Sequence, residues 1–190
     1  MDPYVYPATN VLKNLRDLRD LESLARFEAA ATSRRLEELR ELRQPGKFDI
    51  AHLKAIHGYI FQDVYPWAGE FRTVNIARPG QFYFAFFNMI VSALESAFQT
   101  LPKENYLAGL DARAFSNRAA YYMGEINAIH PFRDGNGRTQ REFIRQLAVR
   151  NGFAVQWSRI TREQMGEASK RSFQQGDPSG LADVVFQSIQ

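Results

Sequence analysis

The stretch that decides the fold is HPFRDGNGRTQR, residues 130–141. The residue before a proline is pushed out of the α region, so the helical pattern that precedes His130 must end there. Gly135 and Gly137 then provide the backbone freedom that a tight turn needs. Helical periodicity resumes at Arg138. We therefore expect a short loop that joins two long helices of a mainly α-helical body.

The same loop has the composition of an anion site. The backbone N–H groups of Gly135, Asn136 and Gly137 can point into one concavity, and the following helix adds its positive N-terminal end. Arg138 and Arg141 are three residues apart and share a face of that helix. The helix dipole disfavours cations there by roughly 0.3–1 kcal/mol each. Two arginines held against this bias predict a bound anion, such as a polyphosphate.

Two further residues of the loop indicate phosphoryl-type transfer. Asp134 offers the hard oxygen ligand that magnesium prefers, and His130 has the pKa range to take a proton from an attacking hydroxyl. Taken singly, His130 can be a structural histidine, Asp134 an N-cap and the glycines turn residues. Together they fit transfer chemistry better. The order differs from a P-loop, because GxxxxGK[ST] does not occur in the sequence.

The flanking sequence predicts further helices. Apolar residues recur at helical spacing over 36–42, and the Pro-Gly pair at 45–46 should end that helix. The residues predicted to start later helices are Asp49, Asn88, Asp111, Thr161 with Gln164, and Asp177 with Pro178. The residues predicted to close them are Pro102, His130 and Gly152. For His52 and His57 we expect packing or surface roles, because their spacing does not place two metal ligands on one helix face.

One β interruption is predicted between residues 73 and 86. TVNIA at 73–77 and QFYFAF at 81–86 are β-branched or aromatic runs separated by RPG, which is typical of a hairpin with a Pro-Gly turn. Core packing is the simpler explanation of the aromatic run. The aromatic run is also too continuous for burial on one face, so part of it is a candidate strand edge or docking surface for a peptide.

Composition limits the other possibilities. A chain of 190 residues, with 45% hydrophobic and 24% charged residues, fits one globular domain. Cysteine is absent, which excludes thiolate chemistry and favours a reducing compartment. The sequence has no signal-like N-terminus and no bilayer-length apolar run, so we expect a cytoplasmic protein without membrane contact. The net charge of +3 is small and the arginines alternate with acids, so direct nucleic-acid binding is not expected.

The loop follows, position for position, the signature HPFx[D/E]GNGRxxR, and the chain therefore resembles the Fic-domain proteins. The segments DPYVYPATNVLKN (2–14), VYPWAGEFRTVNIARPGQF (64–82) and REFIRQLAVRNGF (141–153) also look like bacterial Fic toxins and Fic effector domains. The resemblance covers nearly the whole chain. It implies one Fic domain, a helical bundle with a small β-hairpin flap. Its parts would be an N-terminal lobe over 1–46, a catalytic core over 47–176 and a C-terminal helix over 177–190.

The resemblance implies a magnesium-dependent protein adenylyltransferase, which transfers AMP from ATP to a target protein. His130 would deprotonate a tyrosine, threonine or serine hydroxyl, Asp134 would hold Mg²⁺, and Phe132 would seat the loop. The nucleotide-binding residues that it implies are Gly135, Asn136, Gly137, Arg138 and Arg141. The flap residues that would register the target by strand pairing are Thr73, Val74, Asn75, Ile76, Phe82 and Phe84. Phe86 departs from the polar residue common in relatives, which concerns target docking rather than chemistry.

Fic proteins are commonly silenced by a helix with the pattern [S/T]xxxE[G/N], whose glutamate pairs with the second motif arginine. TLPKEN at 100–105 matches the pattern, but Pro102 lies inside it and would disrupt a helix. SRRLEE at 33–38 has Glu38 where glycine or asparagine is needed. The resemblance therefore implies a small separate antitoxin that supplies the inhibitory helix. A secreted effector, delivered into a host cell, is the alternative.

Other functions stay open at this point. A related enzyme on the same fold would transfer phosphate or UMP, although the intact DGNGR favours attack on the α-phosphate. A catalytically silent protein-binding module and a nucleic-acid-binding protein are the alternatives from other classes. The target protein, the modified residue and the oligomeric state are not determined by these residues.

Overall fold

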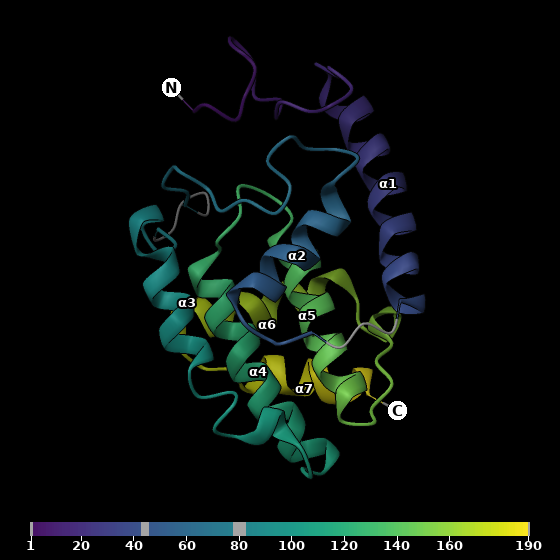
Figure 1. The fold of residues 1–190 in the computed structure, drawn as a ribbon, viewed down its shortest axis with the longest axis vertical. Helices are drawn as coiled ribbons and strands as arrows, with labels where there is room; N and C mark the ends of the chain where they lie inside the picture. Colours follow the sequence, from purple (N-terminus) through teal and green to yellow (C-terminus); the bar gives the residue numbers. More distant parts are fainter. Residues whose placement is uncertain (1, 43–45, 78–82, 190) are drawn as a thin grey trace.

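The computed structural model describes residues 2–42, 46–77 and 83–189, and these residues contain seven α-helices (Figure 1). In chain order they are α1 (Leu21–Glu41), α2 (Ile50–Phe61), α3 (Ile90–Phe98), α4 (Ala112–Ile129), α5 (Asn136–Arg150), α6 (Arg162–Gln175) and α7 (Ser179–Ser188). Short 3-10 turns lie at Phe87–Met89, Asn105–Leu107 and Trp157–Arg159.

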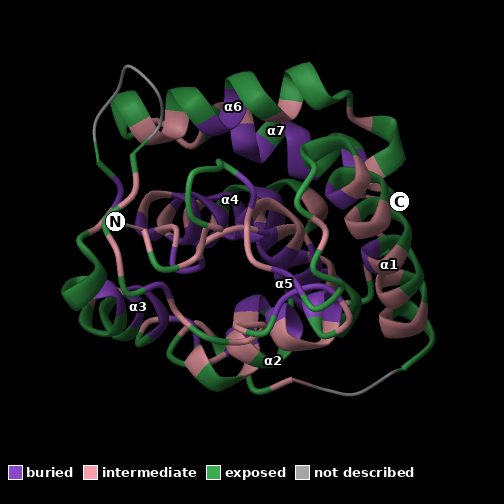
Figure 2. Ribbon diagram, turned by 90° about the horizontal axis from the view of Figure 1, so that it is seen from above, coloured by how far each residue is buried: buried purple, intermediate pink, exposed green. Residues whose placement is uncertain are grey.

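Helices α4 and α5 form the buried centre of the fold. α4 packs against α3, α5, α6 and α7, and α5 also packs against α2. Figure 2 shows the two central helices between α6 and α7 on one side and α2 and α3 on the other. α1 runs along the outside of the bundle and contacts α2. The loop between α4 and α5 is therefore held at both ends by helices that the rest of the protein surrounds.

Most of the predicted helix ends are confirmed. The caps Asp49, Asp111 and Thr161 each accept, through their side chains, a backbone N–H bond from the residue three positions later. The predicted stops His130 and Gly152 adopt left-handed backbone conformations, with φ of 49° and 83°. Local capping chemistry and proline sterics were sufficient to place these ends, because both act within a few residues.

Two predicted helix starts are wrong. Asn88 caps no helix, because it lies inside the 3-10 turn that precedes α3. α5 begins at Asn136 rather than Arg138, since Gly135 takes the N-cap position with a φ of 81°. The predicted start of the last helix is confirmed, because Pro178 is the N-cap of α7 and the side chain of Asp177 accepts the N–H of Ser179 (2.8 Å). At the other end of the chain, α1 stops at Glu41, while residue 45 of the predicted Pro-Gly stop lies outside the described residues.

The predicted β-hairpin is not seen as a pair of strands. Within the described residues this region has one isolated antiparallel bridge, between Ala77 and Tyr83. One further backbone bond runs from the N–H of Phe84 to the carbonyl of Ile76, at 3.2 Å. The predicted turn at 78–80 and Phe82 lie outside the described residues.

Backbone groups at the base of the predicted hairpin are directed at the end of α4. The N–H groups of Arg72 and Ala85 donate to the carbonyls of Pro131 (2.9 Å) and Ala128 (3.3 Å). A residue bonded in this way cannot use the same N–H group for strand pairing. Tertiary contacts with α4 therefore replace part of the ladder that the β-branched sequence favours.

Aromatic stacking fixes the loop on α2. Phe132 is fully buried, and its ring stacks on that of His57 with the centroids 3.8 Å apart. Nδ1 of His57 accepts the N–H of Gly69 (2.8 Å), so Nε2 carries the hydrogen and donates to the carbonyl of Asp134 (3.1 Å). The prediction of a packing role for His57 is confirmed, and so is the anchoring role of Phe132.

One hydrophobic core extends through the bundle and includes Leu24 of α1 and Val185 of α7. The division into a lobe over 1–46, a core over 47–176 and a terminal helix over 177–190 stays a prediction. Among the described helices, none combines the length and the apolar character needed to cross a membrane.

Acid should destabilise the protein through His57. Burial lowers the pKa of His57 from its ordinary value near 6.5 to about 4. Between these two pH values the unfolded chain binds a proton at His57 and the folded protein does not. The free energy of unfolding therefore decreases as the pH falls from about 6.5 toward 4. The full loss is roughly 3 kcal/mol. Urea unfolding without metal or nucleotide, repeated across this range, measures it.

His57→Gln supplies the control, because glutamine cannot titrate. Its free energy of unfolding should depend less on pH between about 6.5 and 4 than that of the parent. Parallel pH profiles for the two proteins would show that His57 is not the titrating group.

Candidate active site

The structure brings the residues of the predicted catalytic loop into one pocket of about 290 Å³. The pocket is lined by His130, Arg133, Asp134, Gly135, Asn136, Gly137, Arg138 and Arg141. His130 follows the C-terminus of α4, whereas the last five of these residues surround the N-terminus of α5. All seven motif residues predicted for catalysis, metal and nucleotide therefore line this pocket.

Two contacts fix the imidazole of His130. Its Nδ1 lies 3.2 Å from the carbonyl oxygen of Asn127, which can only accept a hydrogen bond. Nδ1 therefore carries the hydrogen, and Nε2 is the basic nitrogen. The ring also stacks on Phe84, with the centroids 3.9 Å apart and the planes inclined by 13°. The imidazole thus has the tautomer and the fixed orientation that a general base requires.

Arg72 ties the backbone of His130 to the segment before α3. Its side chain is 2% exposed and contacts carbonyls rather than a carboxylate. The carbonyls that accept from it belong to Val74, Ala85, Ile129 and His130, at 2.5–3.1 Å. Burial lowers the pKa of Arg72 to about 10, so the group stays charged at neutral pH. The positive charge of Arg72 is favourable at this place, because the C-terminus of α4 is the negative end of the helix dipole. The sequence carried no local signal for this contact.

The turn at Gly135 leaves no room for a side chain. Gly135 has a φ of 81°, and a Cβ atom there would lie 2.3 Å from the ring of Phe61. The side chain of Asn136 closes the turn: Oδ1 accepts from the N–H of Phe132 (2.9 Å), and Nδ2 donates to its carbonyl (2.8 Å). Asn136 therefore contributes to the pocket through its backbone, while its buried side chain holds the loop in shape.

Sequence analysis missed a carboxylate from α1. Glu28 makes a short ion pair with Nη2 of Arg138 and also accepts the hydroxyl of Tyr65. Nη1 of Arg138 donates to Thr32 (3.2 Å), and its guanidinium lies over the ring of Phe61, 4.6 Å from the centroid. Glu28 is 110 residues from Arg138 in sequence. The sequence indicated only that Glu28 and Thr32, four residues apart, lie on the same face of a helix.

The two motif arginines have different surroundings. Arg138 pairs with Glu28 and lies 3.7 Å from Asp134, whereas no carboxylate among the described residues pairs with Arg141. Burial and the nearby Arg138 lower the pKa of Arg141. A half-buried guanidinium without an acidic partner, beside a second one, favours an anion between them.

The pocket offers a single carboxylate to a metal ion. Burial and the charge of Glu28 raise the pKa of Asp134. Among residues 2–42, 46–77 and 83–189, no cluster of three or more histidine, aspartate or glutamate side chains is placed to hold a metal. Magnesium is commonly held by one or two carboxylates together with substrate phosphates. The donor set fits a magnesium ion that arrives with a nucleotide.

The described residues that were predicted for target docking differ in exposure, and one of them, Phe84, contacts His130. Thr73 and Asn75 are exposed, and Val74 and Ile76 are partly buried. Phe84 is only 7% exposed because it packs against His130, so its side chain supports the imidazole. Phe82 lies outside the described residues.

Among the described residues, neither candidate for an inhibitory helix pairs a glutamate with Arg141. Glu104 pairs with Arg118 at 2.5 Å and accepts the hydroxyl of Tyr122 at 3.1 Å. In SRRLEE the glutamate of the pattern is Glu37, which is exposed on the outer helix α1. Glu104 therefore has structural partners of its own, and the expectation that neither segment acts as a brake stays a prediction.

Sequence comparison relates the chain to known enzymes. Residues 47–148 match the Fic/DOC family. The chain is 47% identical over 172 residues to the protein adenylyltransferase VbhT of Bartonella schoenbuchensis, covering 90% of this chain and 36% of that protein. It is 37% identical to the probable protein adenylyltransferase y4lH of Sinorhizobium fredii, covering 99% of this chain and 96% of that protein.

Solved structures share the whole fold. The N-terminal Fic domain of a VirB-translocated effector from Bartonella quintana, with bound ADP, superposes with a TM-score of 0.94 at 31% identity. This alignment covers 98% of the present chain and 94% of that one. BepC of Bartonella tribocorum, with bound AMPPNP, gives a TM-score of 0.94 at 28% identity, covering 98% and 96% of the two chains.

Replacing Gly135 with alanine should destabilise the loop through a steric clash. The new Cβ atom would meet the ring of Phe61 at 2.3 Å in a backbone conformation that L residues adopt rarely. Gly152→Ala is the matched control, since Gly152 has the same backbone hand, with a φ of 83°, and no atom within 4 Å of its Cβ position.

Urea unfolding should show that Gly135→Ala loses about 1–3 kcal/mol more stability than Gly152→Ala, because only the first variant adds overpacking to backbone strain. Equal losses for the two variants would mean that the ring of Phe61 does not constrain the turn.

Proposed function

Because the chain belongs to the Fic/DOC family, we propose that it is a protein adenylyltransferase, which transfers AMP from ATP to a hydroxyl side chain of a target protein. The observation that carries the proposal is the pocket itself. It combines a histidine of fixed tautomer with the N-terminus of α5 and two arginines. Such a pocket holds a polyphosphate beside a general base.

The proposed reaction moves one proton and one nucleotidyl group. Nε2 of His130 accepts the proton of the target hydroxyl, and the hydroxyl oxygen attacks the α-phosphorus of ATP. The bond between the α-phosphorus and the bridging oxygen to the β-phosphorus breaks, so pyrophosphate leaves. The backbone N–H groups at the start of α5 and the guanidinium groups of Arg138 and Arg141 would stabilise negative charge on the phosphates.

Asp134 would hold Mg²⁺ with the phosphates of the nucleotide. A bound magnesium ion supplies charge neutralisation across neighbouring phosphate oxygens. In the absence of metal, the negative charge of Glu28 and burial both disfavour the ionised form of Asp134. The neighbouring cation Arg138, 3.7 Å away, acts in the opposite direction and favours the carboxylate.

The target segment would dock beside residues 73–77. An extended segment can pair with a peptide by strand addition. Thr73 and Asn75 are exposed in the segment that follows Arg72, whose N–H donates to the carbonyl of Pro131 in the catalytic loop. This docking places a tyrosine, threonine or serine hydroxyl near His130. The antiparallel bridge between Ala77 and Tyr83 holds the end of segment 73–77 next to the chain that continues from Tyr83.

A separate antitoxin would regulate the enzyme. Among the described residues, neither Glu104 nor Glu37 pairs with Arg141, so a helix from another protein would supply the inhibitory glutamate. The bacterial cytoplasm is the proposed location for a protein controlled in this way. Structural relatives from Bartonella are VirB-translocated effectors, so delivery into a host cell is the alternative.

Label transfer distinguishes the proposed reaction from related ones. ATP labelled at the α-phosphate should label protein in a bacterial lysate, whereas ATP labelled at the γ-phosphate should not. His130→Ala and His130→Asn should each lower the transfer rate by at least about 10²-fold, the typical contribution of general base catalysis. Asparagine tolerates the left-handed backbone of this residue, so its loss of activity would not come from backbone strain.

Label from the γ position would identify phosphate transfer, and label from α-labelled UTP alone would identify UMP transfer. A His130 variant that labels protein at the parent rate would exclude His130 as the base.

Removal of magnesium should abolish transfer reversibly. EDTA should stop labelling, and added Mg²⁺ should restore it. Asp134→Asn should raise the Mg²⁺ concentration needed for half-maximal rate by on the order of tenfold, because it removes the one carboxylate ligand. Asp63→Asn is the control, since Asp63 pairs with Arg35 of α1 and does not line the pocket. An unchanged Mg²⁺ requirement in Asp134→Asn would remove Asp134 from the metal site.

A further inference from the structure

Arg138 is held from the side of α1 by contacts that the loop motif does not contain. Glu28 pairs with Nη2, and Thr32, one turn later on the same helix, accepts from Nη1 at 3.2 Å. Phe61 of α2 supports the flat face of the guanidinium at 4.6 Å. Tyr65 donates its hydroxyl to Glu28 and so fixes the carboxylate in turn.

These contacts use only part of the hydrogen-bonding capacity of Arg138. A guanidinium has five N–H donors, and the bonds to Glu28 and Thr32 use two of them. Other donors stay available to phosphate oxygens in the pocket that Arg138 lines. A planar guanidinium that is held at one edge and stacked on a ring can turn little, so its remaining donors have a defined direction.

We propose that Glu28 is a positioning residue for the nucleotide: through its ion pair with Arg138 it aims that guanidinium at the outer phosphates of ATP. The inference deepens the proposed function and rests on its assignment of a triphosphate to this pocket. Glu28 acts through Arg138 and does not touch the substrate. The outer helix α1 thereby becomes part of the nucleotide site.

The opposite role, a built-in brake, predicts the opposite sign. A carboxylate that competed with phosphate for Arg138 would weaken ATP binding, and its removal would strengthen binding. Three features favour positioning. The carboxylate side chain is only 15% exposed, its second oxygen is occupied by Tyr65, and Arg138 keeps contacts with Thr32 and Phe61 that hold it in place.

The test compares the affinities of ATP and AMP, measured by calorimetry on the full chain. Since Arg138 would contact outer phosphates, Glu28→Ala should weaken ATP binding on the order of tenfold and leave AMP binding nearly unchanged. Glu28→Gln, which keeps the shape but loses the charge, should lie between Glu28→Ala and the parent. A purely structural defect would instead lower both affinities together.

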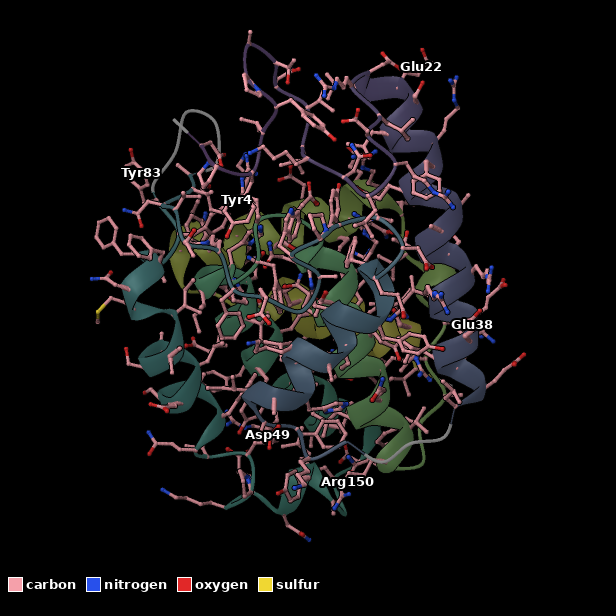
Figure 3. The ribbon with its side chains drawn as sticks, turned by 45° about the horizontal axis from the view of Figure 1, so that its top comes forward. Tyr4, Glu22, Glu38, Asp49, Tyr83 and Arg150 are labelled. Carbon is pink, nitrogen blue, oxygen red and sulfur yellow. The ribbon has the colours of Figure 1, made fainter. Side chains whose placement is uncertain are left out.

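Glu38→Gln provides a matched control. Glu38 also lies on α1, accepts a tyrosine hydroxyl from Tyr59 and pairs with Arg35, but it does not line the pocket. Figure 3 labels Glu38 near the C-terminal end of this helix. Its replacement should leave the ratio of ATP to AMP affinity at the parent value. Unfolding midpoints of both variants show how much each loses in stability.

A double-mutant cycle identifies the route. In an Arg138→Met background, Glu28→Ala should have no further effect on the affinity ratio, because the residue that it positions is gone. A ratio unchanged in Glu28→Ala alone, or raised in favour of ATP, would overturn the positioning role. A parent protein that binds ATP but transfers no α-label would overturn the proposed function alone, while the affinity ratio would still decide the role of Glu28.

Discussion

The seating of Phe132 against His57 is the contact on which the rest of the site depends. It places the loop between α4 and α5 on α2, and the same histidine donates to the carbonyl of Asp134. With the loop in this position, Gly135 passes so close to Phe61 that no side chain fits. The residues at the start of α5 then line the pocket. A core contact between aromatic rings therefore determines where an anion can bind.

Positioning by distant segments is a second principle of this site. Arg72 holds the carbonyl of His130 from one side, and Glu28 holds the guanidinium of Arg138 from the other. Both interactions involve buried or partly buried charges, which are costly unless their hydrogen bonds are complete. Such contacts restrict motion strongly for that reason. The loop contains the proposed reactive groups, while α1 and the segment before α3 supply contacts that hold them.

Local sequence predicted much of the fold because its signals act over a few residues. Aspartate caps, the proline after His130 and the glycine at 152 placed the helix ends. The hairpin prediction was wrong as a pair of strands within the described residues, where the N–H of Ala85 bonds to α4 and the N–H of Arg72, just before the segment, bonds to the loop after α4. Propensity describes what a segment favours in isolation, and tertiary hydrogen bonds can override it.

The sequence by itself determined the composition of the candidate active site, since His130, Asp134 and the two motif arginines lie within twelve consecutive residues. It also indicated the Fic/DOC family, which the comparisons confirm. Only the tertiary structure decided which side chains orient those residues. Glu28 and Arg72 are 102 and 58 residues from His130, and the spacing within one segment carries no information about partners that chain folding brings together.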